Sequence, residues 1–554
     1  MTINFHSLGN LPHAKEISRS LSIVLLGAIL LYPNSIYAFA NSVGSTYMVT
    51  SVLYALPLLV MIGLLPKRWM YVVAAVVCSV VSIIDLTMVD IYNSYLLPGA
   101  IISTIKTNPQ EAAEFYQTNL KEVWRWLPII AMCVVSCLTY QRPGYNKWCW
   151  VASSVALLLP VGFVSVKITA GYHSALTVRY FVDNRILNRP PYNVYYQSVN
   201  AAKELHKRSM MASAKETLFG ATRITPPVCE VYIVAIGESL RYDNLSLNGV
   251  YPRSTTPQLE SMDNLILFDN YYSQACLTMY SVPMLITRAT PQNYDLNFME
   301  RSIIEPFREC GFKTFTIVSN TNLLSSETYL SDGVDSLIVV PNIVRNGEIV
   351  SGDKTMIHIV DSLVQQHDKL FIMMQFLGNH SFYTNYEQEY DVYRPNANTC
   401  TPEERAVCDS LYINAYDNSI LYTDYILSSI IRKIDRPNTI SSFVFVSDHG
   451  EGIGRDGGGH GGNCTPKKEE YHVPFIFWYS DAYAEYFPDK ADNAAGHKTV
   501  RLNGDCIFYS VCDMANITLD SAYAQPAWSV FSDAFQEHER LILVPDGVTC
   551  IRVE

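Results

Sequence analysis

The sequence predicts two parts: an α-helical membrane domain with five transmembrane helices, and an α/β domain that lies outside the membrane. The first observation is compositional. Only 17% of the 554 residues are charged, whereas soluble proteins carry about a quarter, and the long apolar runs are confined to residues 21–170. The second observation is that later residues alternate between uninterrupted strand-like runs and helical stretches, which is typical of a mostly parallel sheet between helices.

Five apolar runs, most of them long enough to cross a bilayer, are predicted as transmembrane helices: roughly 20–40, 47–65, 69–89, 126–141 and 148–167. The fourth run is the shortest. Lys15 and Arg19 precede the first run, and Lys67 and Arg68 follow the second, which places the N-terminus in the cytoplasm and the large domain outside. A cleaved signal peptide ending at Ala40 is the alternative, and it leaves the location of the large domain unchanged.

We expect three segments: a transmembrane domain over 1–170 with an outer loop at 90–122, a linker with an amphipathic helix over 171–228, and an outer domain over 229–554. The net charge of −12 argues against a nucleic-acid partner. Nine of the 13 cysteines fall in the outer domain, where disulfides are stable. Cys400 and Cys408 flank a short polar loop and are the predicted pair, and the remaining connectivity is left open.

The outer domain is predicted to contain strands within 231–239, 313–320, 369–380, 441–450 and 472–480, with a helix over 410–434. Polar residues end three of these runs, namely Glu238, His380 and the pair Asp448-His449. The carboxyl ends of parallel strands share one edge, where binding sites form. Each residue alone is compatible with a cap, a turn or a solvated loop. All four together favour a metal site, and their oxygen and nitrogen donors suit zinc.

These residues lie in motifs that resemble a known family. The matching segments are GESLRYDNLSLNGVYPRSTTPQLE (237–260), TMYSVPML (278–285), FLGNH (376–380), NAYDNSILYTD (414–424), SDHGEGIG (447–454) and HVPFIFW (472–478). The outer domain resembles the alkaline phosphatase and sulfatase superfamily. The whole chain, including TNPQEAAEF at 107–115, resembles the bacterial phosphoethanolamine transferases that modify lipid A and lipopolysaccharide core, a group that includes polymyxin-resistance enzymes.

The resemblance implies roles for individual residues. One zinc ion would be bound by four of them: Glu238, Thr278, Asp448 and His449. Thr278 would also be the nucleophile. Without the motif that flanks it, a threonine at this position is compatible with an ordinary loop hydroxyl. The phosphoryl group or a second zinc would be bound by a further set: His380, His460 and Glu451. His460 lies in the glycine-rich run GRDGGGHGGN, where a solvated loop histidine is the alternative.

The implied reaction transfers phosphoethanolamine from phosphatidylethanolamine, through a covalent threonine intermediate, to lipid A, lipopolysaccharide core or another glycan. The enzyme would lie in the bacterial inner membrane with its catalytic domain in the periplasm, and no oligomer is required. Three alternatives stay open: a phosphoglycerol transferase of the lipoteichoic-acid-synthase kind, a sulfatase or phosphodiesterase, and a non-catalytic glycolipid-binding protein. The sulfatase alternative is disfavoured because residues 276–280 lack the C-x-P-x-R pattern.

Overall fold

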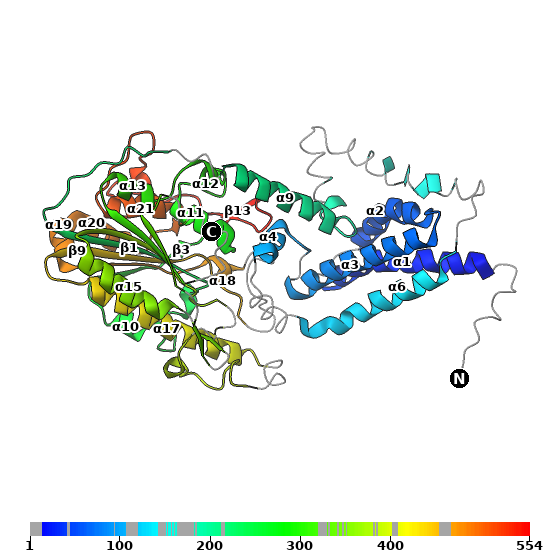
Figure 1. Ribbon diagram of the computed structural model, residues 1–554, viewed down its shortest axis with the longest axis horizontal. Coiled ribbons are helices and arrows are strands. Elements are labelled where there is room, and N and C mark those ends of the chain that lie inside the picture. The colour runs from blue at the N-terminus through cyan, green and yellow to red at the C-terminus, as the bar shows by residue number, and fades with distance from the viewer. Residues whose placement is uncertain are drawn as a thin grey trace. The chain divides into compact units, whose positions relative to one another are not determined.

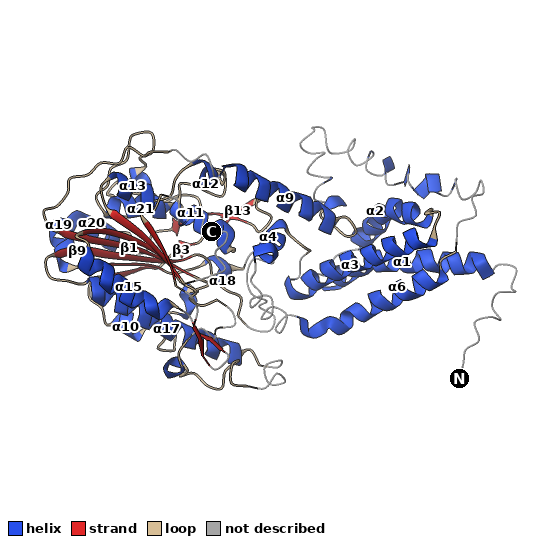
Figure 2. Cartoon of the chain, viewed as in Figure 1, coloured by secondary structure: helices blue, strands red, loops and turns tan. Residues whose placement is uncertain are grey.

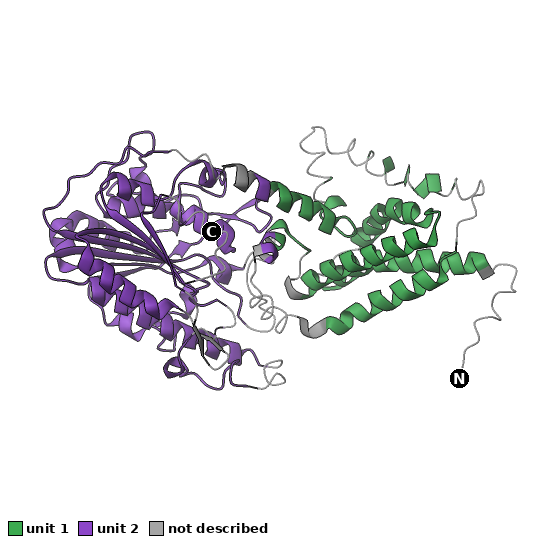
Figure 3. Ribbon diagram, in the orientation of Figure 1, with its two compact units in different colours: residues 1–101, 109–203 green, residues 102–108, 204–554 purple. Residues whose placement is uncertain are grey.

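The computed structural model divides the chain into two compact units, residues 1–101 with 109–203 and residues 102–108 with 204–554 (Figure 3). After the roles that the sequence predicts for them, we call them the membrane unit and the catalytic unit. The structure describes residues 14–40, 45–92, 95–106, 120–141, 186–211, 217–319, 333–340, 343–345, 348–350, 352–380, 386–400, 408–453 and 467–553, with isolated residues between them. The predicted boundaries at residues 170 and 228 stay predictions.

The membrane unit contains three helices long and apolar enough to cross a bilayer among the described residues. They are α1 (Ala14–Ala40), α2 (Ser45–Gly63) and α3 (Arg68–Tyr92), and they match the first three predicted spans. The fourth predicted span contains α6 (Leu127–Thr139), which is apolar but only 13 residues long and follows a 3-10 turn. Half of the fifth predicted span, 148–167, lies outside the described residues.

Hydroxyl groups join α1, α3 and α6 in the interior of this unit. The hydroxyls of Tyr71 and Ser136 both donate to the backbone carbonyl of Ser22, at 2.9 and 2.8 Å. Near the same end, Ser18 donates to the carbonyl of Thr139 at 2.6 Å. Apolar surface gives no net drive for association in lipid, so such bonds and close packing hold membrane helices together.

The catalytic unit is organised by a seven-stranded sheet of order β2-β10-β9-β1-β8-β4-β5 (Figure 2). The strands are β1 (Cys229–Gly237), β2 (Leu265–Phe268), β4 (Lys313–Val318), β5 (Ser336–Val339), β8 (Lys369–Gln375), β9 (Thr439–Ser447) and β10 (Phe475–Tyr479). Central strand β1 pairs in parallel with β8 and β9, while β10 is antiparallel to both β9 and β2. The mostly parallel sheet is confirmed, and the run at 472–480 forms its one antiparallel strand.

Helices cover both faces of the sheet, which explains why its strands are apolar along their whole length. On β1, Val231, Ile233 and Ala235 pack into one core with α15 (Asp353–Gln366) and α17 (Ser410–Ile434). The intervening residues pack into a second core with α13 (Ile304–Glu309) and α21 (Cys506–Met514) (Figure 1). The helix predicted over 410–434 is α17, with those same bounds.

The remaining helices are α4 (Pro98–Lys106), α9 (Asn193–Met211), α10 (Pro257–Glu260), α11 (Thr278–Ile286), α12 (Leu296–Met299), α13 (Ile304–Glu309), α15 (Asp353–Gln366), α17 (Ser410–Ile434), α18 (Lys468–Tyr471), α19 (Asp481–Tyr486), α20 (Pro488–Gly496) and α21 (Cys506–Met514). Three small sheets pair β3 (Tyr271–Tyr272) with β11 (Leu502–Asn503), β6 (Ile343–Arg345) with β7 (Glu348–Val350), and β12 (Leu541–Leu543) with β13 (Cys550–Arg552).

The predicted disulfide between Cys400 and Cys408 is not formed in the structure, where both cysteines are free thiols. The sulfur of Cys408 instead lies 3.0 Å from the hydroxyl of Ser410, at the start of α17. Sequence spacing shows that two cysteines can meet, but the bond also requires matching side-chain directions.

A buried ion pair between the start of β1 and the segment before it tests the packing of this unit. Arg223 and Glu230 are each 1% exposed and form two hydrogen bonds, at 3.0 and 2.6 Å. Replacing Arg223 by Met leaves the Glu230 carboxylate buried without its countercharge. We expect Arg223→Met to lower the free energy of unfolding by about 3–5 kcal/mol, measured as a lower thermal midpoint of the full chain in detergent.

The control for this substitution is Lys433→Met, because Lys433 and its partner Asp361 are 40% and 35% exposed. An exposed pair contributes about 0–1 kcal/mol, so the control should shift the midpoint little. Equal shifts for the two variants would contradict the assignment of a buried, energetically important pair at Arg223.

Candidate active site

The site is built at the carboxyl ends of two neighbouring central strands, β1 and β9. Glu238 directly follows β1, and Asp448 and His449 directly follow β9. The pairing of Gly237 with Ser447 continues past the sheet, because the amide of Asp448 donates to the carbonyl of Gly237 at 3.1 Å. Parallel neighbours that end at the same level therefore bring two carboxylates and an imidazole to one point.

Two glycines allow the backbone to approach these ligands closely. Gly378, in the loop after β8, has φ of +53°, and a Cβ there would lie 3.1 Å from the backbone nitrogen and oxygen of Glu238. At Gly450, a Cβ would lie 2.0 Å from the carbonyl oxygen of Glu469. A larger residue at either position would displace a loop that carries or borders a ligand.

The nucleophile candidate comes from a helix rather than a strand. Thr278 is the first residue of α11. Its Oγ1 atom lies 3.1 Å from Nε2 of His449 and 3.3 Å from Oε2 of Glu238. The structure therefore brings together the four residues predicted as zinc ligands, although they come from three separate segments of the chain.

The donor atoms are arranged as a metal site requires. One ligand atom each from Glu238, Asp448 and His449 lies within 4.8 Å of the others, and all three residues are buried. Nδ1 of His449 lies 2.8 Å from the carbonyl of Gly450 and must donate to it, which leaves the Nε2 lone pair facing the cluster. Oδ2 of Asp448 accepts no hydrogen bond from any described residue.

The electrostatics of the cluster favour a bound cation. Burial, followed by the neighbouring Glu238 carboxylate, raises the pKa of Asp448 to about 7. Burial lowers the pKa of His449, but the carboxylates of Asp448 and Glu238 outweigh this effect and raise it to about 10. Without a metal the cluster holds protons to limit its buried negative charge. A divalent cation replaces those protons as the countercharge.

A second set of polar groups fixes the ligands in place. The hydroxyls of Ser273 and Ser281 both lie within hydrogen-bonding distance of the carbonyl of Asp448. The amide of Ser239, whose φ is +59°, donates to Oδ1 of Asp448 at 3.1 Å. The hydroxyl of Tyr416 in turn donates to the carbonyl of Ser239 at 2.6 Å. Sequence reasoning missed these residues, although Ser281 lies one helical turn beyond Thr278.

The loop after β8 is held by Asp353, a residue that no sequence motif marks as functional. The carboxylate of Asp353 is buried and accepts from the amides of Leu377 and Gly378, at 3.1 and 3.0 Å. It also accepts from the hydroxyl of Ser319. These bonds fix the turn that precedes His380, which is half-buried at the same edge of the sheet.

The other predicted site residues have different placements. Glu451 lies two residues after His449 and is buried. Burial of Tyr383 and Tyr416 raises the pKa values of these two tyrosines, and the nearby Glu451 carboxylate raises them further. Neither Glu451 nor His380 belongs to the three-residue cluster. His460 lies outside the described residues.

A mostly parallel sheet whose strand ends collect these ligands beside a threonine hydroxyl suits a metal-dependent enzyme of the sulfatase type. The family model described as Sulfatase matches residues 230–516, which is more than half of the chain. The protein belongs to the sulfatase family.

Similar proteins cover most of the chain. Phosphoethanolamine transferase EptC of Escherichia coli is 25% identical over 534 residues, covering 89% of this chain and 88% of EptC. Its periplasmic domain in complex with Zn superposes with a TM-score of 0.52 at 24% identity, covering 60% of this chain and 94% of that domain. Phosphatidylethanolamine transferase Mcr-1 of Escherichia coli is 23% identical and covers 84% of this chain and 88% of its own length.

A solved structure also extends over the membrane unit. Integral membrane protein lipooligosaccharide phosphoethanolamine transferase A from Neisseria meningitidis superposes with a TM-score of 0.71 at 19% identity. The match covers 92% of this chain and 97% of that one. At this level of identity the match establishes a shared fold.

Removing one carboxylate tests the metal site. We expect Glu238→Gln to abolish stoichiometric zinc in the purified full chain, measured by elemental mass spectrometry, whereas Glu260→Gln retains it. The substitution removes one of two buried, mutually repelling charges, so the metal-free variant should be no less heat-stable than metal-free wild type. Full zinc occupancy in Glu238→Gln would contradict the site.

Removing one supporting hydroxyl tests how the ligands are positioned. We expect Ser281→Ala to weaken zinc binding about 10- to 100-fold, as for other groups that orient metal ligands, measured by competition with a chelating dye. The control is Ser441→Ala. Ser441 also donates to a backbone carbonyl, at 2.7 Å, but it lies near the opposite end of β9. Equal effects of the two substitutions would indicate a general packing defect.

Proposed function

We propose that the protein is a zinc-dependent transferase of the bacterial inner membrane that moves phosphoethanolamine from phosphatidylethanolamine to a lipopolysaccharide-type glycolipid. The observation that carries the proposal is the position of Thr278. Its hydroxyl lies at 3.1 and 3.3 Å from two donor atoms of the metal cluster. The names of EptC and Mcr-1 supply the transferred group and the donor lipid.

Zinc fits the residues that are present. Glu238, Asp448 and His449 would hold it, with Oγ1 of Thr278 as the fourth donor. Bound zinc would lower the pKa of this hydroxyl and offset negative charge on the phosphoryl oxygens. The zinc complex of the EptC periplasmic domain supports the choice of metal. A second zinc, with His380 and His460 as ligands, belongs to the same proposal. Among the described residues, the one group of possible metal ligands is Glu238, Asp448 and His449.

In the first half-reaction, Oγ1 of Thr278 forms a bond to the phosphorus of phosphatidylethanolamine. The bond between phosphorus and the glycerol oxygen breaks, and diacylglycerol leaves with a proton equivalent to the one that the threonine gives up. The enzyme then carries phosphoethanolamine on Thr278. The position of Thr278 at the start of α11 holds its oxygen in one place, so little ordering is needed before attack.

In the second half-reaction, a hydroxyl or phosphate oxygen of the acceptor attacks the same phosphorus. The bond to Oγ1 of Thr278 breaks, and the threonine regains a proton, which a hydroxyl acceptor releases on attack and which water supplies when a phosphate attacks. His380 and Glu451 lie on segments bordering the cluster and would contact the phosphoryl group or the ethanolamine. The acceptor class is proposed from the name of the Neisseria transferase, which specifies lipooligosaccharide.

The proposed location follows from the membrane unit. We infer five transmembrane helices, a cytoplasmic N-terminus and a periplasmic catalytic unit, supported by the three spanning helices α1, α2 and α3. The sequence boundaries 1–170, 171–228 and 229–554 belong to the same proposal. A membrane anchor suits two lipid substrates, because tethering holds the active site at the surface where both are concentrated.

A direct test is to incubate the full chain in detergent with phosphatidylethanolamine and no acceptor, and then to measure its intact mass. We expect a phosphoethanolamine adduct on wild type, released diacylglycerol, and neither product with Thr278→Ala. The rate of diacylglycerol release by Thr278→Ala should be lower than the wild-type rate by several orders of magnitude, because the nucleophile itself is lost.

Two controls make this test specific. Thr278→Ser keeps a hydroxyl at the same atom and should form the adduct at a reduced rate. Phosphatidylglycerol as the donor distinguishes the phosphoglycerol alternative, since it would leave a glycerophosphate adduct of different mass. No adduct from phosphatidylethanolamine on zinc-loaded wild type would overturn the proposed donor.

A further inference from the structure

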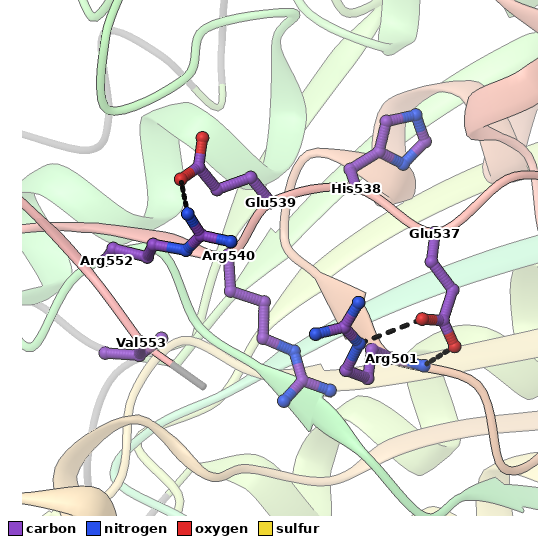
Figure 4. Close-up of a pocket in the computed structure, with 7 residues that line it drawn as sticks. All are labelled: Arg501, Glu537, His538, Glu539, Arg540, Arg552 and Val553. Carbon is purple, nitrogen blue, oxygen red and sulfur yellow. Dashed lines mark hydrogen bonds and ion pairs between the residues drawn. The ribbon is translucent and has the colours of Figure 1, made fainter.

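A polar pocket of about 680 Å³ is lined by residues in the last part of the chain, and none of them belongs to the metal cluster (Figure 4). Three segments build it: the residue that precedes β11, the residues that lead into β12, and the end of β13. The lining residues are Arg501, Glu537, His538, Glu539, Arg540, Arg552 and Val553. Neither the reaction proposed above nor any sequence motif uses them.

The rim of the pocket is made of two exposed ion pairs. Nε of Arg501 lies 2.8 Å from Glu537, and Nη1 of Arg552 lies 3.1 Å from Glu539 (Figure 4). The arginine side chains are 53% and 74% exposed, so each pair is well solvated. Pairs of this kind contribute about 0–1 kcal/mol, and a more highly charged ligand can displace the carboxylate partners.

The floor of the pocket is the buried Arg540, which is only 4% exposed. Its guanidinium donates to the carbonyls of Leu502 and Asn270, at 3.2 and 2.6 Å, and lies 4.1 Å from the ring centre of Tyr272. Three arginines and two glutamates leave the pocket with an excess positive charge, although the whole chain carries −12.

The floor is connected to the nucleophile through a short, well-fixed segment. Tyr272 is followed by Ser273, whose hydroxyl reaches the carbonyl of Asp448. Gln274 then accepts from the amide of Leu543, at the end of β12, at 2.8 Å. Thr278 begins α11 four residues later. One segment, residues 272–278, therefore contacts both the floor of the pocket, through Tyr272, and the metal cluster, through Ser273 and Thr278.

Guanidinium groups bind phosphate and carboxylate through paired, charge-assisted hydrogen bonds. We infer that the pocket formed by Arg501, Arg540 and Arg552 binds an anionic group, phosphate or carboxylate, of the glycolipid acceptor. The inference rests on the proposed function for the acceptor class. It assigns to this surface the recognition of an acceptor group that does not itself react.

The test measures binding of a fluorescent bisphosphorylated lipid A to the full chain in detergent, at low and at physiological salt. We expect the double variant Arg501→Gln, Arg552→Gln to raise the Kd about tenfold or more, since each lost contact is a hydrogen bond to a charged group. The salt dependence of binding should weaken as well. A dephosphorylated glycolipid that retains carboxylate sugars distinguishes the two sources of charge.

The matched control is Arg394→Gln, because Arg394 is also exposed, at 55%, and is paired with an aspartate. An unchanged Kd in the double variant, or an equal rise in the control, overturns the inference. The inference is also overturned if the double variant raises the Kd of a neutral glycolipid, which carries neither phosphate nor carboxylate, by the same factor. Adduct formation on wild type without acceptor tests the proposed function separately, because it does not involve this pocket.

Discussion

The catalytic unit depends on one constraint, the burial of two carboxylates and an imidazole within 4.8 Å of one another. Burying like charges together is costly unless a cation compensates them. Around them, the fold satisfies the other polar atoms with its own groups. The Nδ1 atom of His449, the Oδ1 atom of Asp448 and the carbonyl of Asp448 all have partners, so the atoms left facing inward are those that a metal needs.

The architecture explains why this cluster can be built from distant residues. Glu238 and Asp448 lie at the ends of neighbouring parallel strands, where the sheet register fixes their spacing to within a residue. Thr278 is not on a strand, so its position depends on α11 and on the hydroxyl of Ser281, which ties that helix to the carbonyl of Asp448. The hydrogen bond from Ser281 to the carbonyl oxygen of Asp448 thus helps to set the distance between the nucleophile and the metal ligands.

The elements that could be predicted from the sequence are those with a local pattern of residues. Continuous apolar runs predicted the central strands, and three long apolar runs predicted α1, α2 and α3. The antiparallel direction of β10 could not be read, because an apolar run has the same composition in either direction. Asp353 and Tyr416 could not be found either, since each acts on a loop far away in sequence. Thr278 was selected only through the family motif, because a lone threonine carries no chemical signal.

The segment 272–278 links the two parts of the proposed chemistry. At one end its backbone and side chains contact β12 and the floor of the arginine pocket, and at the other it leads into the nucleophile. A charged group held by the pocket would be positioned relative to Thr278 by a stretch of chain that hydrogen bonds hold in place at Ser273 and Gln274. Holding an acceptor at a remote, unreactive group reduces the entropy lost when its reactive oxygen meets the phosphorus. Binding energy from the pocket would then contribute to the rate of transfer as well as to affinity.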